Sequence, residues 1–128
     1  MADVTPINGE LQTQIMTALW RLGSGRVEQV RGALPPRYRG AYNTIQTVLN
    51  RLTERGLLER RLVGNAFEYR PVMSEAEYLS RSISQALAGA SIDARQAALA
   101  HLIGGLGKRE LADLQQLARD MGKKRRKR

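Results

Sequence analysis

The side chains of this sequence that are best suited to recognising a ligand lie within residues 41–55. They carry amide, hydroxyl and guanidinium groups, and they are Asn43, Thr44, Gln46, Thr47, Asn50 and Arg51. Amides can form paired hydrogen bonds with adenine, a guanidinium suits guanine or phosphate, and a threonine methyl can contact thymine. These groups favour contact with base edges in the major groove of DNA, although an ordinary solvated helix face could have the same composition.

The apolar residues of this segment indicate which of its side chains face outward. They recur at spacings of three and four, which predicts a helix with one apolar face, and they are Ile45, Val48, Leu49 and Leu52. At 100° per residue, the opposite face carries Asn43, Thr47, Asn50 and Glu54, with the other polar residues on its flanks. Residues near the start of such a helix reach deepest in helix-turn-helix docking. We therefore predict base contacts from Asn43, Thr44, Gln46 and Thr47.

The segments on either side predict the fold that positions this helix. Residues 11–22 and 27–34 also have helical apolar spacing, and they end at glycines and at Pro35-Pro36. After Gly56 the period changes to two, and Gly64-Asn65 separates two short alternating runs, which predicts a β-hairpin closed by Pro71. Three helices followed by a hairpin is the plan of a winged helix-turn-helix DNA-binding domain, which we assign to residues 1–72. Trp20 and Phe67 are predicted to lie in its core.

Basic and polar side chains near this helix are predicted to contact the DNA backbone. They are Arg37, Arg39, Tyr42, Asn50, Arg51, Arg60, Arg61 and Asn65, the last three in the hairpin. Cations at these positions would displace counterions from phosphates. Two alternatives remain open, because charges on a hairpin also block edge-to-edge aggregation and Tyr42 could simply pack.

Residues 73–122 are predicted to form a helical dimerisation region. Ser74 to Glu77 and Asp93 to Gln96 are capping-box patterns that would begin two helices, and a third is expected over residues 108–121. These helices are amphipathic and too few to enclose a core, so a second copy of the chain should bury their apolar stripes. The predicted dimer contacts are Leu79, Ile83, Leu87, Leu99, Leu102, Ile103, Leu111, Leu114 and Leu117.

The last six residues, 123–128, are all basic and are predicted to form a disordered tail, because like charges repel one another. Such a tail could solubilise the chain or attract DNA non-specifically. The fold class expected for the whole chain is mostly α with one small β-hairpin.

Composition narrows the possible functions. The 128 residues carry a net charge of +9, which is typical of nucleic-acid binders. With no cysteine and one histidine, His101, the sequence offers no disulfide, thiolate metal site or cysteine nucleophile, so we expect neither an enzyme nor a metal or other cofactor. We expect a cytoplasmic protein, because no apolar run could span a membrane and residues 1–10 do not look like a signal peptide.

The run from Ala41 to Leu52, followed by Gly56-Leu57-Leu58, resembles the penicillinase repressor family (BlaI/MecI type). The segments around Trp20, from Gly64 to Val72 and from Arg95 to Leu99 extend the resemblance over residues 8–121. It implies a homodimer that represses transcription from inverted-repeat operators, often with TACA and TGTA half-sites. It also implies base contacts at Asn43, Thr44, Gln46 and Thr47, and dimerisation after residue 73.

The resemblance leaves the inducing signal open. Antibiotic-responsive members are cut by a sensor-protease at an Asn-Phe bond, and this sequence has no such dipeptide. The copper-responsive branch uses a cysteine motif, which is also absent. Two other functions therefore stay possible: a winged-helix regulator gated by a small ligand, and an RNA-binding module. An adaptor that binds no nucleic acid is a further alternative.

Overall fold

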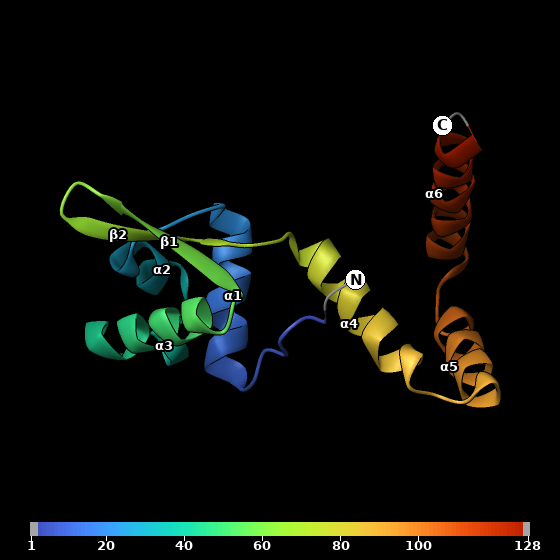
Figure 1. Ribbon diagram of the computed structural model, residues 1–128, viewed down its shortest axis with the longest axis horizontal. Helices are drawn as coiled ribbons and strands as arrows, with labels where there is room; N and C mark the ends of the chain where they lie inside the picture. The colour runs from blue at the N-terminus through green and yellow to red at the C-terminus, as the bar shows by residue number, and fades with distance from the viewer. Residues whose placement is uncertain (1–2, 127–128) are drawn as a thin grey trace. The chain divides into compact units, whose positions relative to one another are not determined.

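The computed structural model describes residues 3–126, which form the helices and the hairpin that the sequence predicts (Figure 1). The elements are α1 (Glu10–Leu22), α2 (Val27–Ala33), a 3-10 turn (Pro36–Tyr38), α3 (Tyr42–Glu54), β1 (Leu58–Val63), β2 (Ala66–Pro71), α4 (Glu75–Ala88), α5 (Ile92–Gly104) and α6 (Lys108–Arg126). The first three helices agree with the predicted bounds to within one residue. The chain divides into two compact units, one ending at Ala86 and the other beginning at Leu87.

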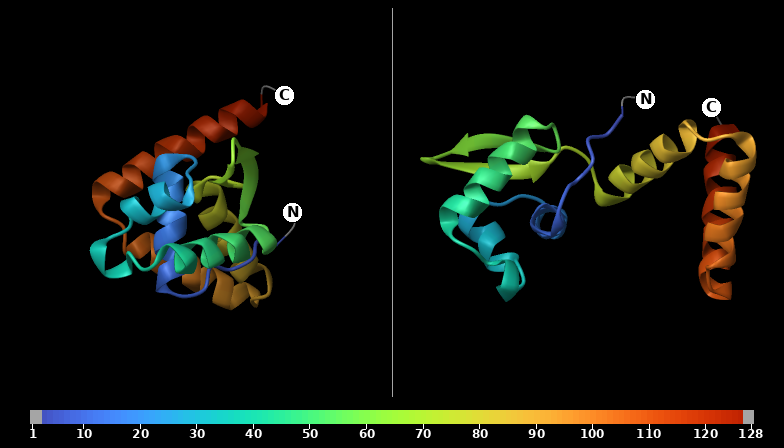
Figure 2. Two further views of the ribbon diagram at one scale, coloured as in Figure 1. Left: turned by 90° about the vertical axis from the view of Figure 1, so that its left-hand side faces the viewer. Right: turned by 90° about the horizontal axis from the view of Figure 1, so that it is seen from below.

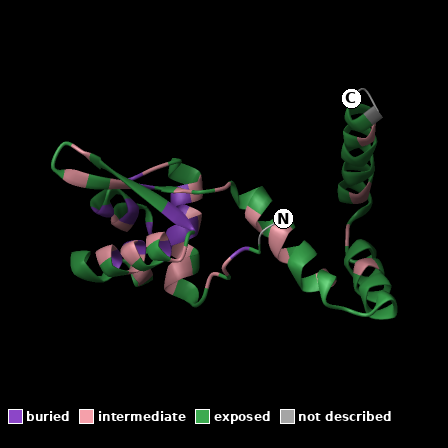
Figure 3. Cartoon of the chain, viewed as in Figure 1, coloured by how far each residue is buried: buried purple, intermediate pink, exposed green. Residues whose placement is uncertain are grey.

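One hydrophobic core joins α1, α2, α3 and the hairpin (Figure 3). Its members are Ile15, Met16, Ala18, Leu19, Val27, Val30, Leu34, Ile45, Leu49, Leu52, Leu57, Leu58 and Tyr69. The apolar stripe of α3 therefore faces inward as predicted, with Val48 partly buried at its edge. Because that stripe is anchored, the polar side of α3 is held at the surface.

The hairpin is antiparallel, and its register runs from the pair Leu58–Pro71 to the pair Val63–Ala66. Gly64 has a φ of 67° in the turn, a left-handed conformation that glycine adopts without steric cost. The backbone of Gly25, between α1 and α2, pairs with the backbone of Tyr69 through two hydrogen bonds of 2.8 and 2.9 Å. This short bridge covers part of the free edge of β2 and ties the hairpin to the helices.

The segment before α1 fastens α4 to the first three helices and the hairpin, which together form the winged unit. The Val4 amide donates to Gln85 Oε1 and the Ile7 amide to the Tyr78 hydroxyl, both at 2.9 Å. The Trp20 indole, packed on the edge of the core, donates to the Met73 carbonyl at 3.0 Å. The unit boundary accordingly falls within α4, after Ala86, and not at residue 72 as the sequence suggested.

The structure confirms the predicted start of α4 and corrects that of α5. Ser74 Oγ accepts the Glu77 amide at 3.1 Å, but the Glu77 carboxylate pairs with Arg81 one turn further along and does not complete a capping box. The cap of α5 is Ser91, whose Oγ accepts the Ala94 amide at 3.2 Å, and not Asp93. A serine two residues earlier provides the cap, so the predicted start lay two residues too late.

The end of α6 also differs from the prediction. The helix continues through Gly122 to Arg126, so disorder is not found over residues 123–126; residues 127–128 lie outside the described part. Basic side chains at a helix C-terminus interact favourably with the exposed carbonyl groups there, which offsets some of their mutual repulsion.

Candidate nucleic-acid interface

The outer face of α3 carries the four side chains predicted to read bases. Asn43, Thr44 and Thr47 are exposed and Gln46 is partly buried, all within the first six residues of the helix. The Thr47 hydroxyl donates to the Asn43 carbonyl at 2.8 Å, so its hydrogen is already used within the helix. Its methyl group and its acceptor lone pairs are left for a ligand. The exposed Arg51 lies one turn further along.

Asn50 has a role that the sequence did not indicate. Its Oδ1 accepts hydrogen bonds from the hydroxyl of the buried Tyr69, at 2.7 Å, and from the Arg60 guanidinium, at 2.8 Å. Both acceptor positions of this oxygen are therefore used within the chain. Asn50 positions the hairpin against α3, which lies beside it (Figure 2), and was predicted only as a backbone contact.

Removing the Tyr69 hydroxyl should loosen the hairpin. We expect Tyr69→Phe to lower the free energy of unfolding by about 1 kcal/mol, because the variant loses a hydrogen bond to a partly buried acceptor. Urea denaturation followed by circular dichroism measures this change. Tyr42→Phe is the matched control, since the Tyr42 hydroxyl has no hydrogen-bond partner among residues 3–126. Equal stability of the Tyr69 variant and the wild type would contradict this role for Asn50.

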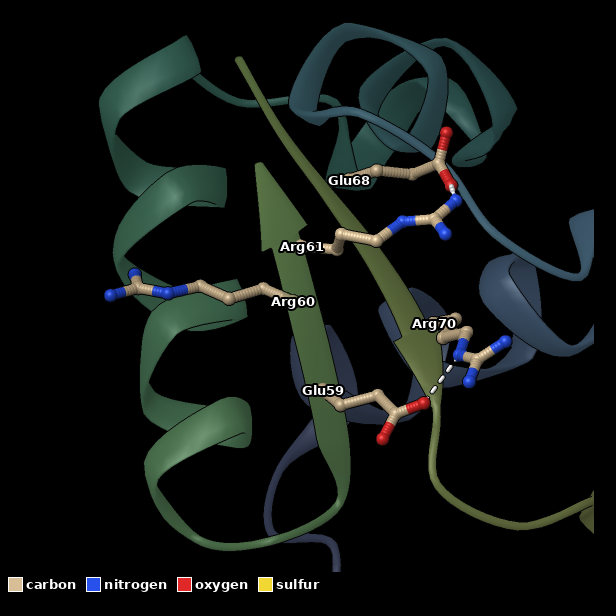
Figure 4. Close-up of a pocket in the computed structure, with 5 residues that line it drawn as sticks. All are labelled: Glu59, Arg60, Arg61, Glu68 and Arg70. Atoms are coloured by element: carbon tan, nitrogen blue, oxygen red, sulfur yellow. Dashed lines mark hydrogen bonds and ion pairs between the residues drawn. The ribbon is translucent and has the colours of Figure 1, made fainter. Parts of the chain in front are cut away.

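The two arginines of β1 lie on opposite faces of the hairpin (Figure 4). Arg60 extends over α3 and stacks on the Phe67 ring, 4.2 Å from its centroid. Arg61 extends to the other face, where it pairs with Glu68 at 3.6 Å, beside a second ion pair between Glu59 and Arg70. Successive residues of a strand alternate between faces, so only one of these two predicted phosphate contacts accompanies α3.

Phe67 is not in the core, contrary to the prediction. It is partly exposed under Arg60, and Tyr69, two residues along the same face of β2, is the aromatic residue that the core buries. Leu62, on the same face, is exposed as well. The alternating pattern located this face correctly, but the core extends only as far as Tyr69.

The two arginines in the connection before α3, Arg37 and Arg39, already have partners within the chain. Arg37 pairs with Glu10 at 3.5 Å and stacks on Tyr38, 4.7 Å from the ring centroid. The hydrogen bond that the Tyr38 hydroxyl donates to the Glu10 carboxylate raises the pKa of Tyr38. Arg39 donates to the carbonyls of Gly32 and Leu34, at 3.1 and 2.8 Å, and so closes the end of α2.

A family model described as the penicillinase repressor matches residues 8–120. This chain belongs to the penicillinase repressor family. It is 36% identical over 124 residues to the transcriptional regulator BlaI of Mycobacterium tuberculosis, strains CDC 1551 and H37Rv, an alignment that covers 90% of this chain and 89% of the relative.

The fold of this penicillinase repressor homologue is supported by one solved structure. The DNA-binding domain of the repressor BlaI, solved in solution, matches with a TM-score of 0.50 and 27% identity, over 60% of this chain and 94% of that domain. A CopR repressor structure matches with a TM-score of 0.45 and 31% identity, over 55% of this chain and 99% of its own. The winged helix-turn-helix predicted from the sequence is confirmed.

The helices after residue 74 of this repressor homologue leave most of their apolar side chains uncovered. None of the residues from 70 to 125 is buried. Leu79, Ile83, Leu102, Ile103, Leu114 and Leu117 are exposed, and Leu87, Leu99 and Leu111 are partly buried. No helix over residues 3–126 is long and apolar enough to cross a membrane.

Proposed function

We propose that this chain is a sequence-specific repressor that binds double-stranded operator DNA as a homodimer and blocks transcription by occupying the promoter. The observation that carries the proposal is the polar start of α3, which the core holds at the surface beside a cationic wing. The polar groups match the donors and acceptors of base edges, and the helix has the size that a major groove admits.

The residues divide into two roles. Asn43, Thr44, Gln46 and Thr47 read bases, since they lie at the start of α3 and are not needed by the core. The phosphates are contacted by Tyr42, Arg51, Arg60 and Asn65. Three more arginines add to the electrostatic attraction for DNA, although each also has a partner within the chain, and they are Arg37, Arg39 and Arg61. Backbone contacts of this kind set orientation and general affinity, whereas base contacts set specificity.

The C-terminal helices support the proposed dimer. The apolar side chains that α4, α5 and α6 expose are too many for a soluble monomer, and a second copy offers the same surface in return. Two symmetry-related copies of α3 would then enter successive major grooves, about 34 Å apart, which requires an inverted repeat in the operator.

Selection from a randomised duplex library tests the proposal. The purified protein should enrich an inverted repeat and should bind it with nanomolar affinity in about 100 mM salt. The selected duplex should also compete at least 100-fold better than double-stranded or single-stranded RNA of the same sequence. Enrichment of RNA would favour the RNA-binding alternative, and failure to retain any nucleic acid in dilute salt would favour an adaptor.

The wing arginine supplies a second prediction. Arg60→Ala should weaken binding to every duplex and should reduce the slope of log K against log salt by about 1, because one phosphate contact is lost. Adding Arg61→Ala should bring the total reduction to about 1 to 2. Fluorescence anisotropy at several salt concentrations measures the slope. Arg70→Ala, on the face away from α3, is the control and should leave the slope unchanged. An unaltered slope for Arg60→Ala would remove the wing from the phosphate contacts.

Induction by a sensor-protease would need a cleavage site other than Asn-Phe. The stretch that corresponds to it, Leu99 to His101, is helical within α5. A protease would have to open that helix before cutting it. Limited proteolysis of the free and the DNA-bound dimer would show whether α5 opens.

A further inference from the structure

A short segment before α1 joins the end of α3 to α4 (Figure 1). It comprises residues 4–8, which we call the N-terminal strap, and it has no regular secondary structure. Its contacts with α3 are made through Arg55, which directly follows that helix. The Thr5 hydroxyl donates to the Arg55 carbonyl at 3.0 Å, and the Arg55 guanidinium donates to the Pro6 carbonyl. The same guanidinium donates to Gln12 Oε1 of α1 at 2.9 Å, so this side of the strap is fixed to the winged unit.

The contacts of the strap with α4 alternate along the chain with those to Arg55. The Val4 amide donates to Gln85 Oε1 and the Ile7 amide to the Tyr78 hydroxyl, both at 2.9 Å. Val4 is only 6% exposed, although it is not part of the core that joins the first three helices and the hairpin. Tyr78 and Gln85 are two helical turns apart, which separates the two contacts by about 10 Å along α4. Two contacts at this separation fix the direction of α4, whereas a single contact would let it pivot.

The strap is the main connection between α3 and α4. Among residues 3–126, no hydrogen bond or ion pair joins the two helices directly. The other attachment of α4 lies at its beginning, where the Trp20 indole donates to the Met73 carbonyl and the Trp20 ring lies 5.7 Å from the Tyr78 ring. These contacts anchor the beginning of α4 to α1. The strap then determines the direction in which the rest of α4 runs from the winged unit.

The direction of α4 bears on how a dimer would present its two copies of α3. The second unit begins at Leu87, within the last turn of α4, and the predicted dimer contacts lie on α4 and on the helices after it. DNA fixes both the distance and the rotation between two half-sites, because each added base pair shifts one half-site by about 3.4 Å and turns it by about 35°. A dimer with a fixed α4 can match only one such spacing without deforming the duplex.

We propose that the N-terminal strap sets the half-site spacing that the dimer accepts, with Thr5, Tyr78 and Gln85 as positioning residues. By holding α4 against the end of α3, the strap fixes the separation and the rotation of the two base-reading faces. It thereby excludes inverted repeats whose half-sites are one base pair closer together or further apart. The strap acts through α4 and does not itself touch DNA. The inference rests on the proposed function, since it needs two copies of α3 on one operator.

Tyr78→Phe combined with Gln85→Met tests the strap, because this double variant removes the two side-chain acceptors that hold the amides of Ile7 and Val4. The phenylalanine ring keeps the packing on Trp20. Fluorescence anisotropy is measured on duplexes that carry the selected half-sites at the selected spacing and at one base pair more or fewer. The wild type should bind the altered spacings at least about 20-fold more weakly, because the duplex must twist to fit.

The double variant should show a much broader preference. We expect it to lose about 3- to 10-fold in affinity at the selected spacing and to bind all three spacings within about threefold of one another, because a loosely held α4 lowers the effective concentration of the second α3 but lets it reach more positions. Gln85→Glu, which keeps an acceptor oxygen, is the matched control and should retain the preference of the wild type. A duplex with a single half-site should be bound within twofold by all three proteins, since the base-reading face is unchanged.

The outcomes separate this inference from the proposed function. A wild-type protein that binds no duplex, or that enriches no inverted repeat, would refute the proposed function. A wild type that accepts all three spacings equally, or a double variant that keeps the wild-type preference, would overturn the role of the strap alone. Weaker binding of the double variant to a single half-site would overturn it too, because the hydrogen bonds would then support α3 itself. The same holds for a loss of helix content or of the dimer, measured by circular dichroism and sedimentation.

Discussion

Replacing Leu117 with glutamate should convert the proposed dimer into monomers and weaken binding to an inverted-repeat duplex by at least about 100-fold. Leu117 is 58% exposed in the single chain and shares a face of α6 with Leu114 and Met121, at spacings of three and four. In a dimer that face would be buried, and an unpaired carboxylate there would lose its hydration. The loss of affinity follows because each half-site would then be bound independently.

Sedimentation equilibrium measures the first effect and anisotropy on the selected duplex measures the second. Gln115→Glu adds the same charge to another side of α6 and should remain dimeric, since Gln115 lies outside the apolar stripe. A Leu117→Glu variant that stays dimeric at micromolar concentration would show that the interface lies elsewhere. A monomer that still binds the inverted repeat as tightly as the wild type would show that dimerisation does not govern affinity.

Gln46→Ala and Thr47→Ala should each cost about 1–3 kcal/mol of binding free energy on the selected operator, which is about 5- to 150-fold in affinity. The loss arises because a base edge is left without its hydrogen bond or its methyl contact. The preference for the correct base at the contacted position should relax at the same time. Binding to a panel of single-base variants of the operator measures both effects.

Arg51→Ala provides the contrast for these two substitutions. Its guanidinium is exposed on the flank of α3 and is expected to contact phosphate, so its removal should weaken binding to all duplexes alike. If Gln46→Ala and Thr47→Ala also weakened all duplexes equally, the start of α3 would not be reading bases. Their effects on folding should be small, because neither residue belongs to the core.

Sequence reasoning succeeded where a feature depends on neighbouring residues. The spacing of Ile45, Leu49 and Leu52 located the buried side of α3, and the polar residues between them then had to lie outside. Gly64 marked the hairpin turn because its left-handed backbone suits few other residues. Among the leucines after residue 74, Leu79, Leu102, Leu114 and Leu117 are exposed and the others are partly buried. That a second copy of the chain covers them stays a prediction.

The errors concern features that depend on contacts between distant residues. Phe67 and Tyr69 occupy equivalent positions in the alternating pattern, but only Tyr69 reaches the core and the Asn50 amide. The pattern could not place α4 with the winged unit, since the hydrogen bond from Val4 to Gln85 joins residues 81 positions apart. Arg55, which the sequence did not single out, binds Gln12 and the Pro6 carbonyl and fastens the N-terminal segment to the end of α3.

The sequence by itself determined that the N-terminal part has three helices and a wing, that one polar helix face stays outside, and that further helices follow whose apolar side chains the core does not bury. Periodicity suffices for these conclusions, because each helix or strand must turn its apolar side away from water. Only the tertiary structure decided that Asn50 holds the wing, that Arg60 and not Arg61 accompanies α3, and that Leu62 and Phe67 lie outside the core. Those outcomes depend on how far the core extends along the hairpin and on which side chains it brings within hydrogen-bonding distance, which local patterns do not record.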